Sequence, residues 1–282
     1  IDNLVNSSLK VFTNLKTITN KDICFKKIDL LNYCELLNVF RELKPDIVIH
    51  FAGLKSVSES TDKPLLYYEV NVTGSINLLK AMESVNCNKI IFSSSATVYG
   101  HPEYFPIDEK HLCNPINAYG RTKHFIENII EDWCNGNQTN KAVLLRYFNP
   151  AGAHPSGNIG ENPMGIPNNL FPFITQVLSG KQKSLNVFGD DYNTPDGTGV
   201  RDYIHVCDLA YGHSLAIDFL LESRGCEIIN LGSGKGFSVL EIVKTFEKFL
   251  EKKLNYQIVS RREGDLDQLL ANSEKAKRSL GW

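Results

Sequence analysis

The sequence lacks the features that mark a membrane-spanning, nucleic-acid-binding or disulfide-stabilised protein. No apolar run approaches the roughly 20 residues of a membrane span, and the N-terminus has no basic-then-apolar secretory signal. The formal net charge is only -2 with lysine and arginine scattered, so we expect neither nucleic acid nor a membrane as a partner. The seven cysteines form no CxxC pair and no zinc-ligand spacing. We therefore expect reduced thiols, no metal site and a cytoplasmic location.

A second absence concerns phosphate binding. A doubly wound nucleotide domain usually begins with a strand, a G-x-G-x-x-G turn and a helix, and this chain has no such opening. Ile1-Asp2-Asn3 instead looks like the end of a second strand, where an acidic side chain binds ribose hydroxyls; a terminal residue without a role is the alternative. We therefore expect a fragment that lacks the first strand, helix and phosphate loop. The later segment 232–236 has no Walker spacing and is better explained as a turn.

In the first half, hydrophobic patterns of strand and helix alternate, which predicts a parallel sheet with crossover helices. The predicted strands are Ile23–Ile28, Asp46–Phe51, Lys89–Ser95 and Ala142–Tyr147. The predicted helices are Leu31–Leu43, Pro64–Val85 and Asn117–Trp133. Near-continuous apolar strands indicate burial on both faces of the sheet.

After Phe148 the pattern changes to loops rich in proline, glycine and asparagine, with shorter elements between them. The predicted loops are Asn149–Asn169 and Asp190–Gly199, and the predicted elements are helices Asn169–Leu178 and Ser238–Leu250 and strands Leu185–Phe188 and Cys226–Leu231. The predicted fold class is α/β: a doubly wound parallel sheet over 1–148, followed over 149–282 by a smaller α/β substrate-binding domain. We expect both domains to be truncated at their outer ends, and about 200–222 to pack back on the first domain.

Three polar residues stand where redox chemistry at a sugar carbon would need them. Ser95 ends a predicted strand, and Tyr119 and Lys123 lie on one face at the start of a predicted helix. A nearby cation lowers an acid's pKa by roughly 1–3 units, which would bring the tyrosine phenol, with an ordinary pKa of about 10, within reach as a base. With 11 tyrosines, about one Tyr-x-x-x-Lys is expected by chance, so the pattern gains its weight from its position after the strand and serines.

Longer motifs along the whole chain resemble the UDP-glucose 4-epimerase family of extended short-chain dehydrogenases/reductases. The motifs that carry the resemblance are 46–55 (DIVIHFAGLK), 92–100 (FSSSATVYG), 119–123 (YGRTK), 145–150 (LRYFNP), 152–157 (GAHPSG), 166–170 (IPNNL), 197–206 (GTGVRDYIHV) and 261–265 (RREGD). The resemblance implies a Rossmann-type fold and NAD-dependent, reversible inversion at C4 that interconverts UDP-galactose and UDP-glucose through a transient 4-keto sugar.

The resemblance also implies roles for individual residues. Ser95, Tyr119 and Lys123 would be catalytic. NAD would be bound by Asp2, Asn3, Asp29, Leu30, Phe51, Ala52, Gly53, Lys55, Asn71, Ser93, Tyr119, Lys123 and Phe148. The UDP-sugar would be bound by Lys55, Ser95, Asn149, Asn169, Leu170, Asn186, Phe188, Arg201, Tyr203, Arg262, Asp265 and Leu269. A homodimer through the helices 65–81 and 119–133 is expected from the same resemblance.

Simpler explanations remain open for several of these residues. Phe51 and Phe148 could be core aromatics, Asn149 and Asn169 turn formers, and the two arginines surface salt bridges. Relatives carry a small residue or a tyrosine at the position of Leu269, so acceptance of N-acetylated sugars stays open.

Two other functions compete with epimerisation. A nucleotide-sugar 4,6-dehydratase needs an additional acid and base, where this chain has Ala96-Thr97. A noncatalytic fragment that binds NAD or a nucleotide sugar is the alternative from a different class.

Overall fold

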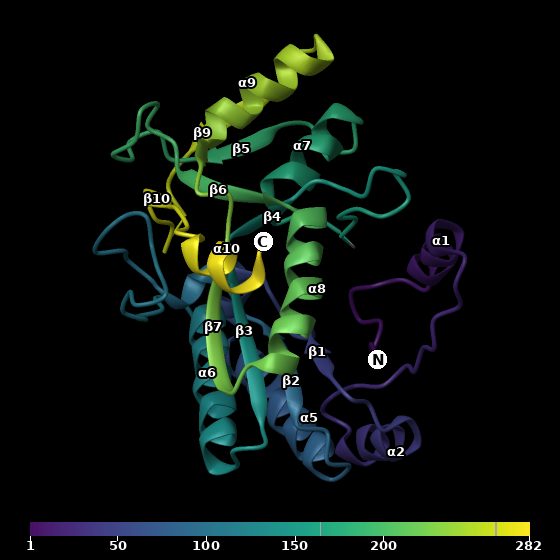
Figure 1. The fold of residues 1–282 in the computed structure, drawn as a ribbon. Coiled ribbons are helices and arrows are strands. Elements are labelled where there is room, and N and C mark those ends of the chain that lie inside the picture. The colour runs from purple at the N-terminus through teal and green to yellow at the C-terminus, as the bar shows by residue number, and fades with distance from the viewer. Residues whose placement is uncertain (164, 263) are drawn as a thin grey trace.

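The large sheet of the molecule is parallel and carries helices on both faces, which confirms the predicted doubly wound α/β fold (Figure 1). The computed structural model describes residues 1–163, 165–262 and 264–282. The strands, in the spatial order β1-β2-β3-β7, are β1 (Val48–His50), β2 (Lys89–Ser93), β3 (Lys141–Tyr147) and β7 (Gly225–Leu231). Since β7 comes from the second half of the chain, a boundary at residue 148 does not separate the two parts cleanly.

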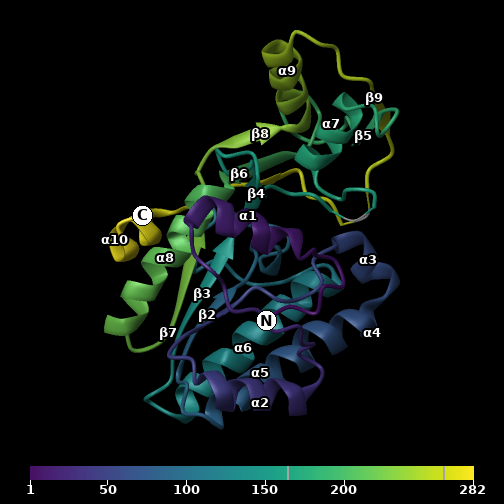
Figure 2. The same ribbon diagram turned by 90° about the vertical axis from the view of Figure 1, so that its right-hand side faces the viewer.

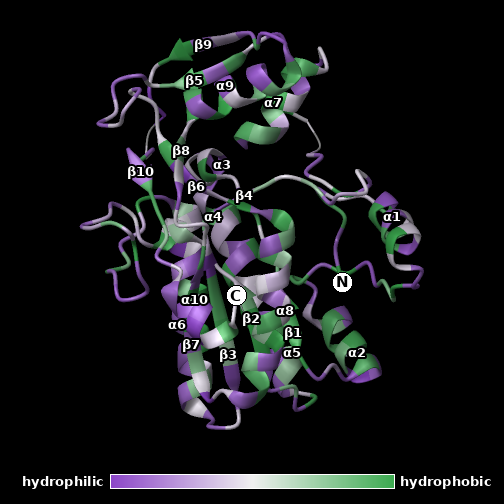
Figure 3. Ribbon diagram, turned by 45° about the horizontal axis from the view of Figure 1, so that its top comes forward, coloured by the Kyte–Doolittle hydropathy of each residue, from purple (hydrophilic) through white to green (hydrophobic). Residues whose placement is uncertain are grey.

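Alternating side chains of the central strands build two separate cores. In β2, Ile90 and Phe92 belong to one cluster and Ile91 to the other, as the two-residue period of a strand requires. In β3, Leu144 and Leu145 divide in the same way. Figure 2 shows the resulting layers, with α2, α5 and α6 on one face of the sheet and α8 and α10 on the other. Figure 3 shows mostly hydrophobic colouring along β2 and β3.

The helices around this sheet are α2 (Tyr33–Leu43), α3 (Val57–Asp62), α4 (Pro64–Tyr67), α5 (Gly74–Glu83), α6 (Ala118–Gly136), α8 (Val206–Glu222) and α10 (Glu274–Leu280). The helix α1 (Lys10–Thr19) has no buried residue and lies apart from the sheet (Figure 1). A π-helical segment, Tyr68–Thr73, joins α4 to α5, so the helix predicted over 64–85 is continuous but contains a wider turn. Single π turns often occur at functional sites, and this one carries Asn71. Among the described residues, no helix combines the length and apolar character needed to span a bilayer.

Over the residues that the structure describes, the smaller part of the molecule contains two short sheets and two helices. Its strands are β4 (Asn149–Ala151), β6 (Val200–His205), β8 (Gly236–Ser238) and β10 (Gln268–Leu269) in one sheet, and β5 (Leu185–Phe188) and β9 (Tyr256–Val259) in the other. The helices α7 (Leu170–Leu178) and α9 (Val239–Leu250) pack on β5 through an apolar cluster. A capping box of Ser238 and Glu241 explains where α9 begins.

Three parts of the sequence prediction need correction. The predicted strand Ile23–Ile28 is absent as a strand, because only Lys27 forms a bridge, with Asp2; an apolar pattern becomes a strand only where a neighbour supplies hydrogen bonds. The predicted loop 149–169 begins with β4. The sequence analysis also missed α1, α8 and α10. Met164 in that loop and Glu263 in the 261–265 motif lie outside the described residues.

Candidate active site

The helix α6 begins directly beside the end of β2. Asn117 caps it, its side-chain oxygen accepting a hydrogen bond from the Gly120 amide at 2.8 Å. A Cβ atom on Gly120 would lie 2.8 Å from the Thr97 carbonyl oxygen. Glycine therefore permits the close approach that brings Tyr119 to the serines after β2.

The three predicted catalytic residues are all buried at this junction, with exposures of 9% for Ser95, 8% for Tyr119 and 5% for Lys123. The Lys123 ammonium donates to the Ser93 carbonyl at 2.8 Å and lies 6.0 Å from the centroid of the Tyr119 ring. The Ser95 hydroxyl accepts a hydrogen bond from the Thr97 hydroxyl at 3.0 Å. The arrangement places a phenol, a hydroxyl and an ammonium together at one largely buried junction.

Burial shifts the pKa values of Tyr119 and Lys123 in opposite directions. It raises the pKa of Tyr119, and the interaction with the Ser95 hydroxyl opposes that rise. Burial also lowers the pKa of Lys123 to about 8, against the charge of Glu127, which raises it. The expectation that Lys123 lowers the tyrosine pKa is therefore wrong for this structure, because loss of hydration outweighs other influences on the phenol.

The chain after β1 forms the next part of the site. Phe51 is 59% exposed and stacks on the His213 ring at 4.7 Å, so it is not a core aromatic. Gly53 has a φ of +142°, and a Cβ atom there would lie 2.9 Å from the Asn71 Oδ1 atom. Asn71, itself buried, accepts from the Leu54 amide at 2.7 Å and donates to the Leu54 carbonyl at 3.0 Å. The turn after β1, which includes Ala52, is held open by these contacts.

The residues predicted to contact adenosine gather at one place near the N-terminus. Asp2 pairs with Lys27 in a bridge, and Asn3 donates from its side chain to the Asp29 carboxylate at 2.8 Å. The other Asp29 oxygen accepts from the Leu31 amide, and the Leu30 side chain packs on the core. These acidic and amide groups thus lie close to one another, and their role in binding NAD stays a prediction.

A cationic group lies between the β5 and β10 regions. The Arg262 guanidinium stacks on the Phe188 ring at 4.6 Å and donates to the Asp265 carboxylate at 3.0 Å. Arg201 approaches the same carboxylate at 3.8 Å, and the Asn186 side chain accepts from that of Gln257. The structure therefore brings both predicted arginines to one acidic residue.

Other predicted substrate residues divide between open and buried positions. Lys55 and Asn169 both bind the Glu161 carboxylate, at 3.0 and 2.6 Å, so they lie close together although far apart in sequence. Asn149 is paired with Tyr203 across β4 and β6, and burial raises the pKa of the Tyr203 phenol to about 12. Three apolar residues lie in cores, fully or in part: Phe148, Leu170 and Leu269.

The glycine-rich segment 232–236 binds an anion from its own chain. The buried Asp202 carboxylate accepts from the Ser233 amide at 2.7 Å, the Ser233 hydroxyl at 2.6 Å, the Gly234 amide at 2.8 Å and the Ala271 amide at 3.1 Å. Because this internal carboxylate takes up its amides, the segment acts as a structural turn, which agrees with the absence of Walker spacing.

Two residues that contact the site were missed by sequence reasoning. His213 on α8 bonds to the Ser93 hydroxyl at 2.8 Å, and Glu161 joins Lys55 to Asn169. His213 could not be predicted as a site residue, because α8 itself was not predicted. Glu161 lies in a glycine- and proline-rich loop, where spacing does not indicate what a side chain meets.

A parallel nucleotide-binding sheet with a buried Ser-Tyr-Lys group at its carboxyl edge defines a nicotinamide-dependent enzyme of the short-chain dehydrogenase/reductase type. The chain matches the family model described as GDP-mannose 4,6 dehydratase over residues 2–282. It is 52% identical to human UDP-glucose 4-epimerase over 269 residues (95% of this chain and 77% of that one). It is likewise 52% identical to UDP-glucose 4-epimerase of Bacillus subtilis, covering 100% of this chain and 83% of that one. The crystal structure of UDP-glucose 4-epimerase from Bifidobacterium longum in complex with NAD⁺ and UDP superposes with a TM-score of 0.97 at 47% identity, covering 100% of this chain and 84% of that chain. The chain belongs to the UDP-glucose 4-epimerase family.

Proposed function

We propose that the chain is an isomerase that interconverts UDP-galactose and UDP-glucose by NAD-dependent, reversible inversion at C4. The observation that carries this proposal is the buried group of Ser95, Tyr119 and Lys123 on the same molecule as the paired arginines Arg201 and Arg262. The first group suits proton transfer at a carbon-bound hydroxyl, and the second suits a pyrophosphate, since each arginine offers a planar fork of donors.

The residues around the first group fit NAD. Gly53 leaves the turn after β1 without a side chain, and Ala52 beside it is exposed. Asp2 would favour NAD over NADP, because a carboxylate repels a 2′-phosphate. The residues that would hold NAD are Asp2, Asn3, Asp29, Leu30, Phe51, Ala52, Gly53, Lys55, Asn71, Ser93, Tyr119, Lys123 and Phe148. When bound, NAD supplies reversible hydride transfer at the sugar carbon.

The protein side chains would transfer the proton and hold the sugar oxygen and the cofactor. Tyr119 acts as a base only in its ionised form: the phenolate would take the proton of the sugar 4-hydroxyl, and the resulting phenol would return it in the second half of the reaction, while the Ser95 hydroxyl bonds to the same oxygen. Lys123 is already fixed by the Ser93 carbonyl, which leaves its other two donors for the nicotinamide ribose. Inversion requires that the 4-keto sugar turn over between the two transfers, so its binding site must leave room for that rotation.

The UDP-sugar would lie between the large sheet and the smaller part of the molecule. The residues that would contact it are Lys55, Ser95, Asn149, Asn169, Leu170, Asn186, Phe188, Arg201, Tyr203, Arg262, Asp265 and Leu269. Leu269 is 8% exposed and pairs with Arg201 across β10 and β6. Its intermediate size motivates the hypothesis that it gates N-acetylated sugars.

The decisive experiment incubates the protein with UDP-galactose and a trace of NAD, following nucleotide sugars by NMR and NADH by absorbance. UDP-glucose without net NADH, lost in Tyr119→Phe, is the expected result. A 4-keto-6-deoxy product would identify a dehydratase, although Ala96 and Thr97 offer no acid-base pair. No turnover despite tight NAD binding would identify a noncatalytic binding protein.

A homodimer and a cytoplasmic location complete the proposal. Leu65 on α4 is 82% exposed and Phe125 on α6 is 46% exposed, and Phe125 lies 5.9 Å from the Tyr68 ring, so these helices present an apolar face for a second copy. Sedimentation should give a dimer that Leu65→Glu dissociates.

The seven free thiols suit a reducing compartment, and a tagged chain recovered outside the cytoplasm would refute that location. We divide the chain near residue 148; of the segment 200–222 that was expected to return to the first domain, α8 packs on the large sheet and β6 belongs to the smaller part, while β7 and α10 return as well.

A further inference from the structure

Glu127 on α6 is a buried carboxylate that the proposed reaction does not use. It is 2% exposed, and it accepts hydrogen bonds from the Ser94 hydroxyl at 2.5 Å and from Arg146 Nε at 2.9 Å and Nη2 at 2.7 Å. Arg146 is 3% exposed and lies over the Tyr99 ring at 4.9 Å. A buried charge needs such a partner, because an unpaired one is strongly destabilising. Glu127 thus joins α6 to the end of β2 and to β3.

Ser94, which donates a hydrogen bond to Glu127, lies between two residues of the active site. Ser94 lies between Ser93, whose carbonyl accepts from Lys123, and Ser95, the proposed catalytic hydroxyl. Two side chains of α6 therefore hold the serine segment: Lys123 through a main-chain oxygen and Glu127 through a hydroxyl. If the second bond were lost, the serine segment could shift relative to the helix.

The spacing along α6 strengthens the connection. Tyr119, Lys123 and Glu127 follow one another at intervals of four residues, so they lie on one face of the helix. A change in the contacts of Glu127 with Ser94 and Arg146 would therefore move the helix that carries both catalytic side chains. Displacements of about 1 Å can reduce an enzymatic rate by about 100-fold.

Glu127 also acts on the charge of Lys123. Burial lowers the pKa of Lys123 to about 8, and the negative charge of Glu127 opposes that change. Arg146 from β3 and His124 from the same helix face Glu127, with His124 Nδ1 at 3.6 Å from its carboxylate. His50 from β1 lies near Lys123, and both its burial and the lysine charge hold its pKa at about 3, so it stays neutral.

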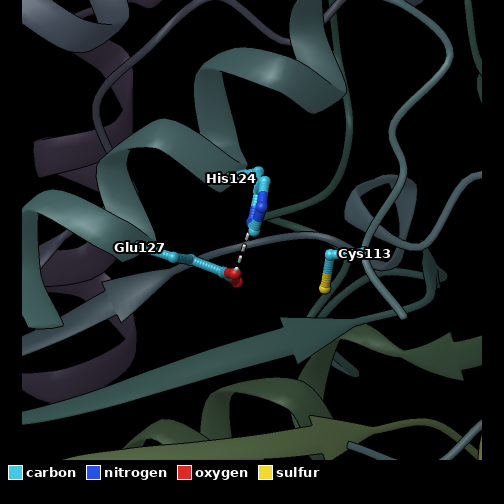
Figure 4. Close-up of side chains that lie close together, drawn as sticks. All are labelled: Cys113, His124 and Glu127. Atoms are coloured by element: carbon cyan, nitrogen blue, oxygen red, sulfur yellow. Dashed lines mark ion pairs between the residues drawn. The ribbon is translucent and has the colours of Figure 1, made fainter. Parts of the chain in front are cut away.

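The same carboxylate belongs to a group with Cys113 and His124 that has the residue types of a metal site (Figure 4). One Glu127 oxygen accepts from Ser94 and Arg146 Nε, and the other accepts from Arg146 Nη2. A cation bound to either oxygen would lie beside the Arg146 guanidinium, whose positive charge would repel it. The contacts therefore favour an ion pair over metal binding.

We propose that Glu127 is a positioning residue for the epimerisation proposed above: its bonds to Ser94 and Arg146 fix α6, which carries Tyr119 and Lys123, against β2 and β3. It touches neither the cofactor nor the sugar in this role.

The test is Glu127→Gln, with Glu131→Gln as the matched control on an exposed position of the same helix. We expect kcat to fall by about 10- to 100-fold with little change in KM for UDP-galactose. The alkaline limb of the kcat profile should move to lower pH by about one unit, because Lys123 loses a neighbouring negative charge. A folded Glu127→Gln variant with the wild-type kcat and the wild-type alkaline limb would overturn the proposal.

A second variant keeps the proposal testable if Glu127→Gln does not fold. Ser94→Ala removes the bond to β2 and leaves the Glu127–Arg146 pair intact. A several-fold lower kcat at unchanged KM supports the proposal, and a wild-type kcat in Ser94→Ala overturns it. Failure of the proposed function itself is distinguishable, since the wild-type protein would then show no epimerisation at all.

Discussion

Replacing Asp202 by asparagine should destabilise the protein strongly although the residue lies outside the catalytic group. Asp202 is fully buried, and its carboxylate accepts four hydrogen bonds, two at each oxygen. Asparagine has the same shape but replaces one acceptor by an NH₂ donor. At the oxygen that binds Gly234 and Ala271, that donor would face two amides, so the NH₂ group must turn to Ser233.

The magnitude follows from this arrangement. The Ser233 hydroxyl can reverse and accept from the new donor, but the Ser233 amide then has no partner, which costs about 1–3 kcal/mol. The remaining bonds lose the assistance of a charge, which adds about 1–2 kcal/mol. We expect a loss of about 3 kcal/mol, equivalent to about 1 M in the urea midpoint at a slope of about 3 kcal/mol per M.

The assay is urea unfolding followed by circular dichroism, with Asp190→Asn as the control. Asp190 is an exposed turn residue with the same chemistry, so its midpoint should stay near that of the wild type. If the midpoint of Asp202→Asn matched that of the control at an unchanged slope, the account of the 232–236 turn as an internal carboxylate site would be refuted.

Four further predictions concern the active site directly. Tyr119→Phe should lower kcat by about 10²–10⁴-fold with NAD still bound through its other contacts, because the variant lacks the hydroxyl that transfers the proton; NMR turnover and cofactor titration check this, and an active variant contradicts it. Gly120→Ala should cost about 1–3 kcal/mol of stability and reduce kcat, since its Cβ atom meets the Thr97 carbonyl at 2.8 Å; an unchanged Tm would speak against that contact. NAD affinity should weaken as pH rises above about 8, where the Lys123 ammonium loses its proton, and Lys123→Met should remove this dependence in calorimetric titrations between pH 7 and 9. Leu269→Ala should raise turnover of UDP-N-acetylgalactosamine relative to UDP-galactose by about tenfold, and an unchanged ratio would show that this residue is no gate.

The sign of the lysine prediction follows from the direction of its shift. The folded-state pKa of Lys123 lies below its ordinary value of 10.5, so burial costs stability while the group is charged. That cost is fully present below pH 8 and disappears as pH rises towards 10.5, so this residue makes the folded state relatively more stable in alkali. NAD affinity changes in the opposite direction, because binding of the cofactor needs the charged form of Lys123. A stability increase alongside a loss of NAD affinity above pH 8 would separate the two effects.

Local patterns were enough to predict the large sheet but not every element around it. The strand Lys141–Tyr147 contains the apolar run 142–145, so burial on both faces could be predicted directly. The segment 23–28 has a similar composition but meets only Asp2, and composition does not reveal whether a partner exists. The helix 206–222 contains apolar residues around much of its circumference, so it lacks the clear stripe by which the sequence indicates a surface helix.

In the candidate site, too, the sequence predicts local relations between residues but not properties that depend on the assembled fold. The four-residue interval placed Tyr119 and Lys123 on one helix face, and the strand end placed Ser95 opposite them, because both are local relations. The shift of the Tyr119 pKa was predicted in the wrong direction. The four-residue interval shows that a cation lies near the phenol, but it does not show how far burial removes water from both groups. Burial is a property of the assembled fold.

One signal for Glu127 was nevertheless present in the sequence. Arg146 interrupts a strand that is otherwise apolar and expected to be buried on both faces, and a buried guanidinium requires an opposite charge close by. The helix Ala118–Gly136 crosses back over that strand, and Glu127 is the acidic residue on the face that carries Tyr119 and Lys123. A lone charge in a buried parallel strand therefore predicts an acidic partner on a covering helix. Here that partner lies one helical turn from a catalytic lysine, so the ion pair and the active site share one helix face.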